Sequence, residues 1–406
     1  MTAQNYKSYL WAWLLSAILT VGIVGVFNYI VDPYGFYRIV DRAGFNQQKE
    51  GVRSKIRYVK ALELPLRKPK TIIIGSSRVH DGINPLHALL SNPAYAPVYN
   101  LGIDMARIHE SKEYLRHALV NDEIKRVIIG LDFFMFNASQ KVNYNFDSEL
   151  VGRKINIGDY LSTSIFSRDA FVDSIRTIKT SHGQLERKEF LSNGFRPGNF
   201  AFYKIKSYEA LHYYTNYIFM SSLPNQTKYY ADVTSDKGVF DDFEDILKIS
   251  AANSIDVKLY ISPAHANLDG EGILAAGKWK MMENWKRKVV MLAGRYNVPI
   301  WDFSGYNSIT TESVRTPMTY YWDSSHFTEV VSDMILKRIF TEGVNVPTDF
   351  GVLLSDENIE SHLATIRNNR QKYAENHKVE LRSLNESYQL FLNGGAMDIK
   401  KTEGMF

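Results

Sequence analysis

The sequence contains no cysteine among its 406 residues. This absence excludes disulfide bonds, zinc sites with thiolate ligands and a thiol nucleophile. It is compatible with an oxidising compartment but does not establish one. Histidines at the HxxxH spacing of a metal-binding helix are absent as well. We therefore expect neither a catalytic metal nor another cofactor.

The sequence also lacks a strong excess of charge of one sign. Its 48 Lys and Arg residues and 44 Asp and Glu residues leave a net charge of +4, and no basic run is dense enough for a nucleic-acid groove. We therefore expect no nucleic-acid partner. Internal repeats and low-complexity tracts are absent too. A chain of this length can form one large domain or two ordinary ones.

One long apolar run stands near the N-terminus, at residues 9–31. It is long enough to cross a hydrocarbon core of about 30 Å as a helix, and aromatic residues at both ends suit the two membrane interfaces. A cleaved signal peptide is the alternative. The apolar part is too long for one, and no small-residue cleavage site precedes Asp32-Pro33. We predict a single transmembrane anchor.

The side of the membrane on which the body lies is less directly readable. Lys7 lies on one side of the anchor, and Arg38, Arg42 and Lys49 lie on the other. This count mildly favours a cytoplasmic body. The lack of cysteine and the function inferred below favour the opposite side. We predict a body that is extracytoplasmic, either periplasmic or extracellular.

A strand-and-helix alternation begins at Lys70. The expected strands are apolar runs at residues 71–74, 98–102, 126–131, 257–261 and 299–303. The expected helices cover residues 85–90, 105–120, 239–253, 279–296 and 327–340. Near-continuous apolar strands that alternate with helices indicate a parallel sheet covered on both faces. We predict an α/β fold in three layers around a five-stranded parallel sheet.

The chain divides into five predicted parts. They are a tail (1–8), the anchor (9–31), a juxtamembrane connector (32–69), an α/β domain (70–345) and a charged helical tail (346–406). Residues 55–67 of the connector could form a helix along the membrane or along the domain. Residues 138–235 read as an insertion with helical patches at 169–180 and 207–220. Because it follows a parallel strand, the insertion is expected at the rim of the active site.

Ser77 is the first candidate catalytic residue. The apolar strand of residues 71–74 stops at Gly75 and two serines, which is how a buried strand presents a side chain at the edge of an α/β sheet. A turn that uses Gly and Ser only for its conformation is the structural alternative.

Asp323 and His326 are the second candidate pair. At this three-residue spacing a carboxylate and an imidazole lie on the same side of a helical turn. The carboxylate can hold the Nδ1 proton while Nε2 takes a proton from a serine. A helix N-cap at Asp323 is the structural alternative. In a sheet ordered 2-1-3-4-5, Ser77 and this pair would meet over the carboxyl edge.

The GSSR motif that contains Ser77, Gly102 after the second strand, and Asp323-x-x-His326 together resemble the SGNH (GDSL-like) hydrolase superfamily. The resemblance covers roughly residues 71–340 without the insertion, and it implies a flavodoxin-like fold. It also implies Ser77 as nucleophile, His326 as general base and acid, and Asp323 as the orienting carboxylate. The backbone amides of Ser77 and Gly102 would stabilise the oxyanion.

The N-terminal anchor and the DPYG connector make the chain most similar to the membrane-anchored members that act in bacterial envelope polymer acylation, the DltD-like and AlgX/AlgJ-like group. This resemblance implies a serine esterase or O-acyltransferase acting on a cell-envelope or secreted polysaccharide. It also implies a polytopic membrane acyltransferase as partner. The alternative is a non-catalytic polymer-binding or scaffold subunit.

The sequence departs from the family pattern at Asp132, where the family has an asparagine that donates to the oxyanion. An ionised aspartate cannot donate. Either Asp132 is protonated, or Asn137 or Arg78 supplies the donor, or the hole has two backbone donors. Arg78 could instead bind an anionic substrate group, or pair with Asp81 or Asp104. His265, which follows the fourth strand, is expected on the substrate rim.

Overall fold

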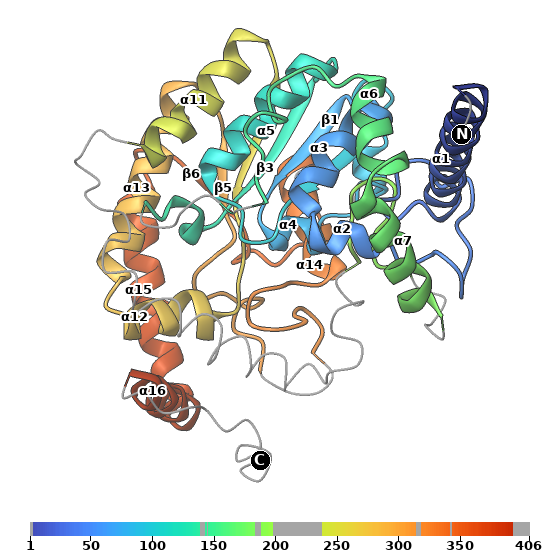
Figure 1. Cartoon of the computed structure of the whole chain (residues 1–406). Coiled ribbons are helices and arrows are strands. Elements are labelled where there is room, and N and C mark those ends of the chain that lie inside the picture. The colour runs from blue at the N-terminus through green and yellow to red at the C-terminus, as the bar shows by residue number, and fades with distance from the viewer. Residues whose placement is uncertain are drawn as a thin grey trace.

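The computed structural model describes residues 3–138, 143, 145–182, 188–197, 238–313, 318–341 and 343–392. These residues form an α/β body around a six-stranded sheet with the order β2-β1-β3-β4-β5-β6 (Figure 1). The parallel strands are β1 (Thr71–Gly75), β2 (Val98–Gly102), β3 (Arg126–Leu131), β4 (Asp256–Ile261) and β5 (Ile300–Asp302). The helix expected at 207–220 lies outside the described residues.

The predicted strand count was wrong, because a sixth strand extends the sheet. This strand, β6 (Val352–Leu354), pairs antiparallel with β5, so that Trp301 lies opposite Leu353. Three residues are too few to show a strand period in the sequence. The full strand order therefore differs from the predicted one at the β5 edge. The expected domain boundary at residue 345 falls short of this strand.

The helices cover both faces of the sheet. One core cluster joins the sheet to α3 (Ile56–Arg67), α5 (Ile108–Asn121), α11 (Val239–Ala252), α13 (Trp279–Arg295) and α15 (Ile359–Asn376). The other joins it to α4 (Ser77–Gly82), η1 (Ala88–Leu90) and α14 (Glu329–Phe340). The remaining elements outside α1 are α2 (Glu50–Ser54), η2 (Phe133–Phe136), α6 (Ile157–Tyr160), η3 (Leu161–Ile165), α7 (Arg168–Ser181), η5 (Asn267–Gly272), α12 (Ile273–Ala275) and α16 (Lys378–Leu392).

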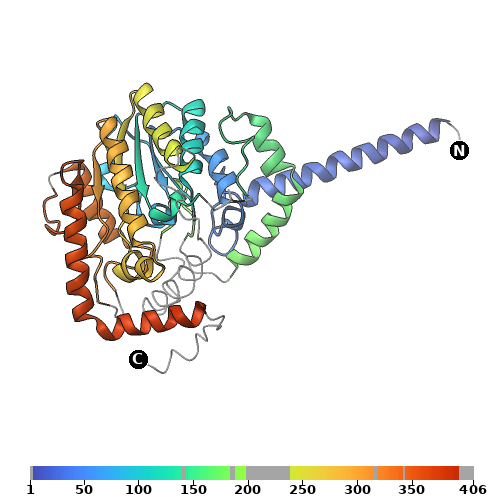
Figure 2. The same ribbon diagram turned by 90° about the vertical axis from the view of Figure 1, so that its left-hand side faces the viewer.

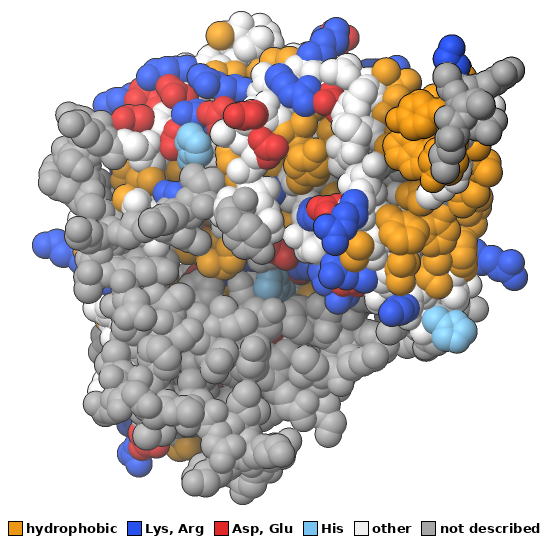
Figure 3. All heavy atoms as spheres, viewed as in Figure 1, with side chains coloured by type: hydrophobic (Ala, Val, Ile, Leu, Met, Phe, Trp, Pro, Cys, Tyr) orange, Lys and Arg blue, Asp and Glu red, His pale blue; other side chains and the backbone are white. Residues whose placement is uncertain are grey.

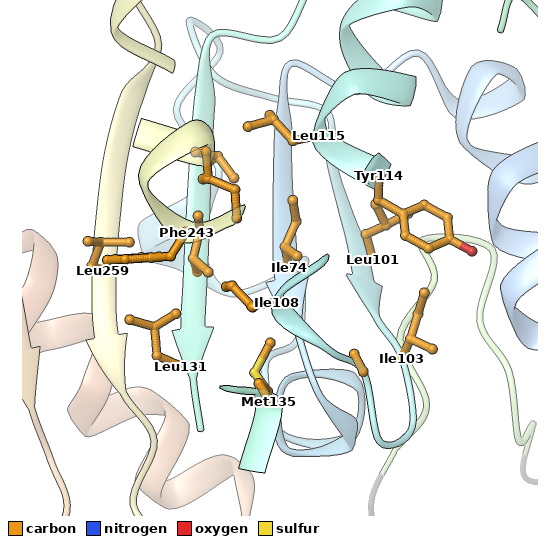
Figure 4. Packing of buried hydrophobic residues seen from close by; sticks show 14 of the residues in the cluster. Ile74, Leu101, Ile103, Ile108, Tyr114, Leu115, Leu131, Met135, Phe243 and Leu259 are labelled. Carbon is orange, nitrogen blue, oxygen red and sulfur yellow. The ribbon is translucent and has the colours of Figure 1, made fainter. Parts of the chain in front are cut away.

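Side chains of successive strand residues enter the two clusters alternately, as the pleat requires. Ile72 and Ile74 of β1 belong to the cluster under α5 and α11, whereas Ile73 belongs to the cluster under α14. Figure 4 shows Ile74 in the same cluster as Leu101, Ile108 and Leu115. Because both faces are buried, the strands read as continuous apolar runs in the sequence.

The N-terminal helix α1 (Ala3–Val31) projects away from the body (Figure 2). Its residues Tyr6–Val31 are long and apolar enough to span a membrane. The C-terminal end is fixed to the body, since the Asn28 amide donates to the Ile165 carbonyl over 2.9 Å. The connector helix α3 packs on the domain, which decides between the two placements expected for residues 55–67.

Candidate active site

Ser77 lies where β1 ends at the carboxyl edge of the sheet. Gly75 is required at that end, because a Cβ there would lie 2.4 Å from Val79 Cγ2 and 2.9 Å from the Gly130 carbonyl. Ser76 then caps helix α4, with its hydroxyl accepting from the Arg78 amide over 3.1 Å. The helix therefore begins at Ser77. This short helix was not predicted, and within the helix expected at residues 85–90 the structure has the 3-10 helix η1 (Ala88–Leu90).

The three predicted catalytic side chains meet in the structure. His326 Nε2 lies 2.8 Å from Ser77 Oγ, and His326 Nδ1 lies 2.8 Å from Asp323 Oδ2. An ionised carboxylate can only accept, so Nδ1 carries the proton and Nε2 accepts from the serine hydroxyl. Asp323 is fully buried and His326 is 6% exposed. This is the connectivity of a serine–histidine–aspartate relay.

Asp323 and His326 are brought together by a turn and not by a helix. Asp323 Oδ1 accepts from the Ser325 amide over 2.6 Å and from the His326 amide over 2.8 Å, as in an Asx turn. The turn lies between two residues joined by a bridge, Tyr321 and Phe327. The N-cap of α14 is Thr328, which removes the alternative in which Asp323 caps that helix.

The protonation of His326 is set by opposing effects. Burial lowers the pKa of His326, but the charge of Asp323 and its hydrogen bond outweigh burial. The pKa is therefore raised above its ordinary value. Arg196 opposes this rise and Asp81 adds to it, so groups around the relay also influence the histidine.

Asp132 does not donate a hydrogen bond toward the expected oxyanion. Its Oδ2 accepts from Ser76 Oγ over 2.6 Å and its Oδ1 accepts from Arg78 Nη1 over 2.7 Å. Both partners are neighbours of Ser77 in the chain, and Asp132 is 1% exposed. The carboxylate is thus an acceptor that fixes the turn carrying the nucleophile. The role expected from the family's asparagine is not taken over by this residue.

The Gly102 amide is also already engaged. It donates to Asn100 Oδ1 over 2.8 Å, whereas we expected it to face the substrate. The Asn100 amide group in turn donates to the carbonyls of Val79 and Ile83, at 2.8 Å each. Asn100 therefore ties β2 to the end of α4. Sequence reasoning missed it, although a polar residue inside an apolar strand is a signal that could have found it.

The Ser77 amide can still donate a hydrogen bond to an oxyanion, as expected. Ser77 is the first residue of α4, so its N–H has no acceptor within the helix. A carbonyl oxygen of a substrate attacked by Ser77 can accept from this N–H. The Gly102 amide and the side chains of Asp132 and Arg78 are held by protein groups in this conformation.

Arg78 is a structural residue and is not open to an anionic substrate. It is 1% exposed, and its guanidinium binds Asp269 through two hydrogen bonds of 3.0 and 3.1 Å. Burial opposes its charge, but Asp269 and Asp132 raise its pKa overall. The prediction that Arg78 pairs with aspartates holds, although the partners differ from the expected Asp81 and Asp104.

Two other predicted substrate residues are placed inside the protein. His265 is fully buried, with Nε2 near the Glu312 carbonyl at 2.8 Å and Nδ1 accepting from the Asn267 amide at 3.3 Å. Burial lowers the pKa of His265 to about 4. Both nitrogens are engaged, so we assign it a structural role. Asn137 is 1% exposed and forms the C-cap of η2.

A second charged cluster adjoins the relay. Arg196 of the insertion binds Asp81 through hydrogen bonds of 2.7 and 2.8 Å, and binds Asp104 through hydrogen bonds of 3.2 and 3.1 Å. His80, Asp81 and Asp104 have the spacing of metal ligands, but the Arg196 guanidinium already binds both carboxylates. Burial and the Lys60 charge lower the pKa of His80 to about 4.

Comparison with known proteins does not extend these assignments. No protein-family model matches the chain, and no curated protein matches it either. What the site can do is therefore argued from its own geometry. A buried, oriented histidine beside a serine hydroxyl is an arrangement that activates the hydroxyl as a nucleophile.

Proposed function

We propose that the chain is an SGNH-type serine esterase or O-acyltransferase, anchored in the membrane by α1 with its body on the extracytoplasmic side. The observation that carries the proposal is the relay of two 2.8 Å contacts joining Ser77, His326 and Asp323. A flavodoxin-like arrangement of the sheet belongs to the same proposal, and the order of the five parallel strands supports it.

The proposed reaction has two acyl-transfer steps. Ser77 Oγ attacks the acyl carbonyl carbon while its proton moves to His326 Nε2. The leaving alcohol takes this proton as the carbon–oxygen bond breaks, which leaves an ester on Ser77. A sugar hydroxyl or water then gives its proton to Nε2 as its oxygen attacks the acyl carbon. The bond between that carbon and Ser77 Oγ breaks, and Nε2 returns the proton to Oγ. Asp323 stabilises the imidazolium in both steps.

The substrate class follows from the resemblance of the motifs and not from the pocket. We propose a cell-envelope or secreted polysaccharide as the acceptor or donor of the acyl group, with a polytopic membrane acyltransferase as partner. The insertion supports selection at this site, since Arg196 reaches Asp81 and Asp104 beside the relay. A protein wall there would favour transfer to a sugar over hydrolysis by excluding water.

Ester hydrolysis by the purified full-length chain in detergent tests the proposal. We expect release of acetate from a chromogenic acetate ester, and a loss of at least about 1000-fold in Ser77→Ala and His326→Ala. Ser91→Ala is the matched control, because Ser91 is an exposed serine on the same domain. Equal hydrolysis by Ser77→Ala and the wild type would refute the assignment of Ser77 as the nucleophile.

A second candidate function is a non-catalytic polymer-binding or scaffold subunit. It is favoured by one observation, namely that the Gly102 amide and Asp132 are both engaged by protein groups. Loss of one oxyanion donor typically costs about 100-fold to 1000-fold in turnover. Cells that carry Ser77→Ala decide between the two candidates. Unchanged polymer acylation supports the scaffold, and lost acylation at equal protein level supports the enzyme.

A further inference from the structure

Helix α7 exposes three large apolar residues beside charged ones and buries several polar residues. Phe171, Val172 and Ile175 are 36%, 37% and 37% exposed. Figure 3 shows a broad hydrophobic surface on the side of the molecule where α1 and α7 lie. A helix at a protein–water boundary normally turns its apolar side chains inward. The exposed side of α7 therefore mixes large apolar side chains with basic ones, as helices that lie in a membrane interface do.

The buried face of α7 explains why the helix keeps this orientation. Asp173 accepts from Lys55 Nζ and from the Tyr34 hydroxyl, both over 3.1 Å. Ser174 donates to Asn28 Oδ1 of α1 over 3.1 Å. These hydrogen bonds hold α7 against the end of the anchor helix and against the connector. The exposed apolar face is therefore fixed beside α1.

An apolar groove continues this surface. It has a volume of about 830 Å³ and lies between α1 and the segment of α6 and η3. A Cβ at Gly22 would meet nothing within 4 Å, whereas a Cβ at Gly25 would lie 2.8 Å from Phe166 Cε1. The groove is thus open at Gly22 and closed at Gly25. Its walls include Val26, Tyr29, Leu66, Ile157 and Leu161.

The length of α1 fixes the depth of this groove in a bilayer. A hydrocarbon core of about 30 Å takes about 20 helical residues, and the apolar span Tyr6–Val31 has 26 residues. Any 20-residue window within that span includes Gly22 and Gly25. The Phe166 ring lies next to Gly25 and is 53% exposed. A helix α1 that spans a membrane therefore carries Phe166 to the edge of the hydrocarbon.

We propose that α6, η3 and α7 form a lipid-inserted platform, with acyl chains of the bilayer occupying the groove beside α1. The exposed basic residues Arg168, Arg176 and Lys179 of α7 would then bind lipid phosphates. The platform rests on the proposed anchoring by α1 and is independent of catalysis. It fixes the orientation of the body, and hence the distance between Ser77 and the membrane.

Spin labels on single cysteines test the platform in the full-length chain, which has no native cysteine to remove. Phe166→Cys and Ile175→Cys report on the platform. Leu86→Cys and Val379→Cys are controls, because these residues are 76% and 80% exposed on other parts of the body. The labelled proteins are placed in vesicles of phosphatidylcholine and phosphatidylglycerol. Collisions with oxygen, which concentrates in hydrocarbon, are compared with collisions with a water-soluble nickel chelate.

We expect labels at Phe166 and Ile175 to collide with oxygen several-fold more than with nickel, relative to the two controls. Nickel access equal to that of the controls would overturn the platform. Shielding from both reagents would also overturn it, because a protein surface would then cover the site. Repeating the measurement in Ser77→Ala separates this result from the proposed activity, since lipid access is expected to stay unchanged.

Discussion

His326 Nε2 lies 2.8 Å from Ser77 Oγ, although 249 positions separate the two residues in the chain. The contact is made over the carboxyl edge of the parallel sheet, where β1 delivers the serine and the turn before α14 delivers the histidine. Asp323 completes the relay from the same turn. An active serine hydrolase with this geometry has properties that can be measured.

As the pH is lowered, activity should begin to fall at a pH above the ordinary pKa of histidine. His326 must be neutral to accept the Ser77 proton, and Asp323 raises the pKa of His326 despite burial. We therefore expect the acidic limb of kcat/KM above about pH 6.5. A pH–rate profile with a chromogenic ester checks this. A limb well below pH 6 would contradict the assigned electrostatics.

Removal of the Arg196 charge should move the acidic limb of the pH–rate profile to higher pH and should destabilise the fold. Arg196 lowers the pKa of His326, so in Arg196→Gln the limb is expected at higher pH. The variant also leaves Asp81 without its guanidinium partner, at a cost of about 3 kcal/mol in unfolding free energy. Arg196→Lys is the control that retains the charge. An unchanged limb in Arg196→Gln would show that the cluster does not act on the relay.

Asp132→Asn should reduce activity, although it restores the residue typical of the resembled family. The side chain at position 132 faces Ser76 and Arg78, so an amide there loses an ion pair with a buried guanidinium. We expect a lower kcat and a loss of about 3 kcal/mol in unfolding free energy. Thermal unfolding and steady-state kinetics measure the two effects. A rise in kcat would indicate that position 132 faces the oxyanion.

Lys60 should make stability depend on pH above neutrality. Its ammonium donates to the carbonyls of Asn100, Gly102 and Gly194 at 2.6–3.0 Å, and burial lowers its pKa to about 7. Between pH 7 and 10 the unfolded chain therefore binds more protons, and stability rises with pH by up to about 1.4 kcal/mol per unit. Lys60→Met is the comparison. Parallel pH–stability curves for the two proteins would contradict this.

The strands were predictable because their sequence signal is local. Apolar runs that end in Gly or polar residues located β2 and β3 at the bounds found in the structure. β6 was not predictable, since its three residues become a strand only by pairing with β5. A local sequence pattern indicates a strand that is buried on both faces, but it does not indicate a short edge strand that forms only by pairing with another strand.

The sequence predicted the three residues of the relay, but it did not predict the residues that hold them in place. Spacing identified Asp323 and His326, although an Asx turn and not a helix brings them together. Asp269 binds Arg78 across 191 positions, and Arg196 comes from the insertion, so no local pattern marks either residue. The Gly102 amide was expected to face the substrate, but it donates to Asn100, because a family motif names a residue and does not say which neighbours engage it.

Labelling by a fluorophosphonate tests the central claim most directly, because an activated serine displaces its fluoride and becomes phosphonylated without the natural substrate. Full-length protein is treated in detergent, and the modified residue is located by mass spectrometry. We predict a single adduct on Ser77 that is lost in Ser77→Ala and formed at least about 100-fold more slowly in His326→Ala. An unlabelled Ser77, or labelling at an equal rate without His326, would contradict the relay.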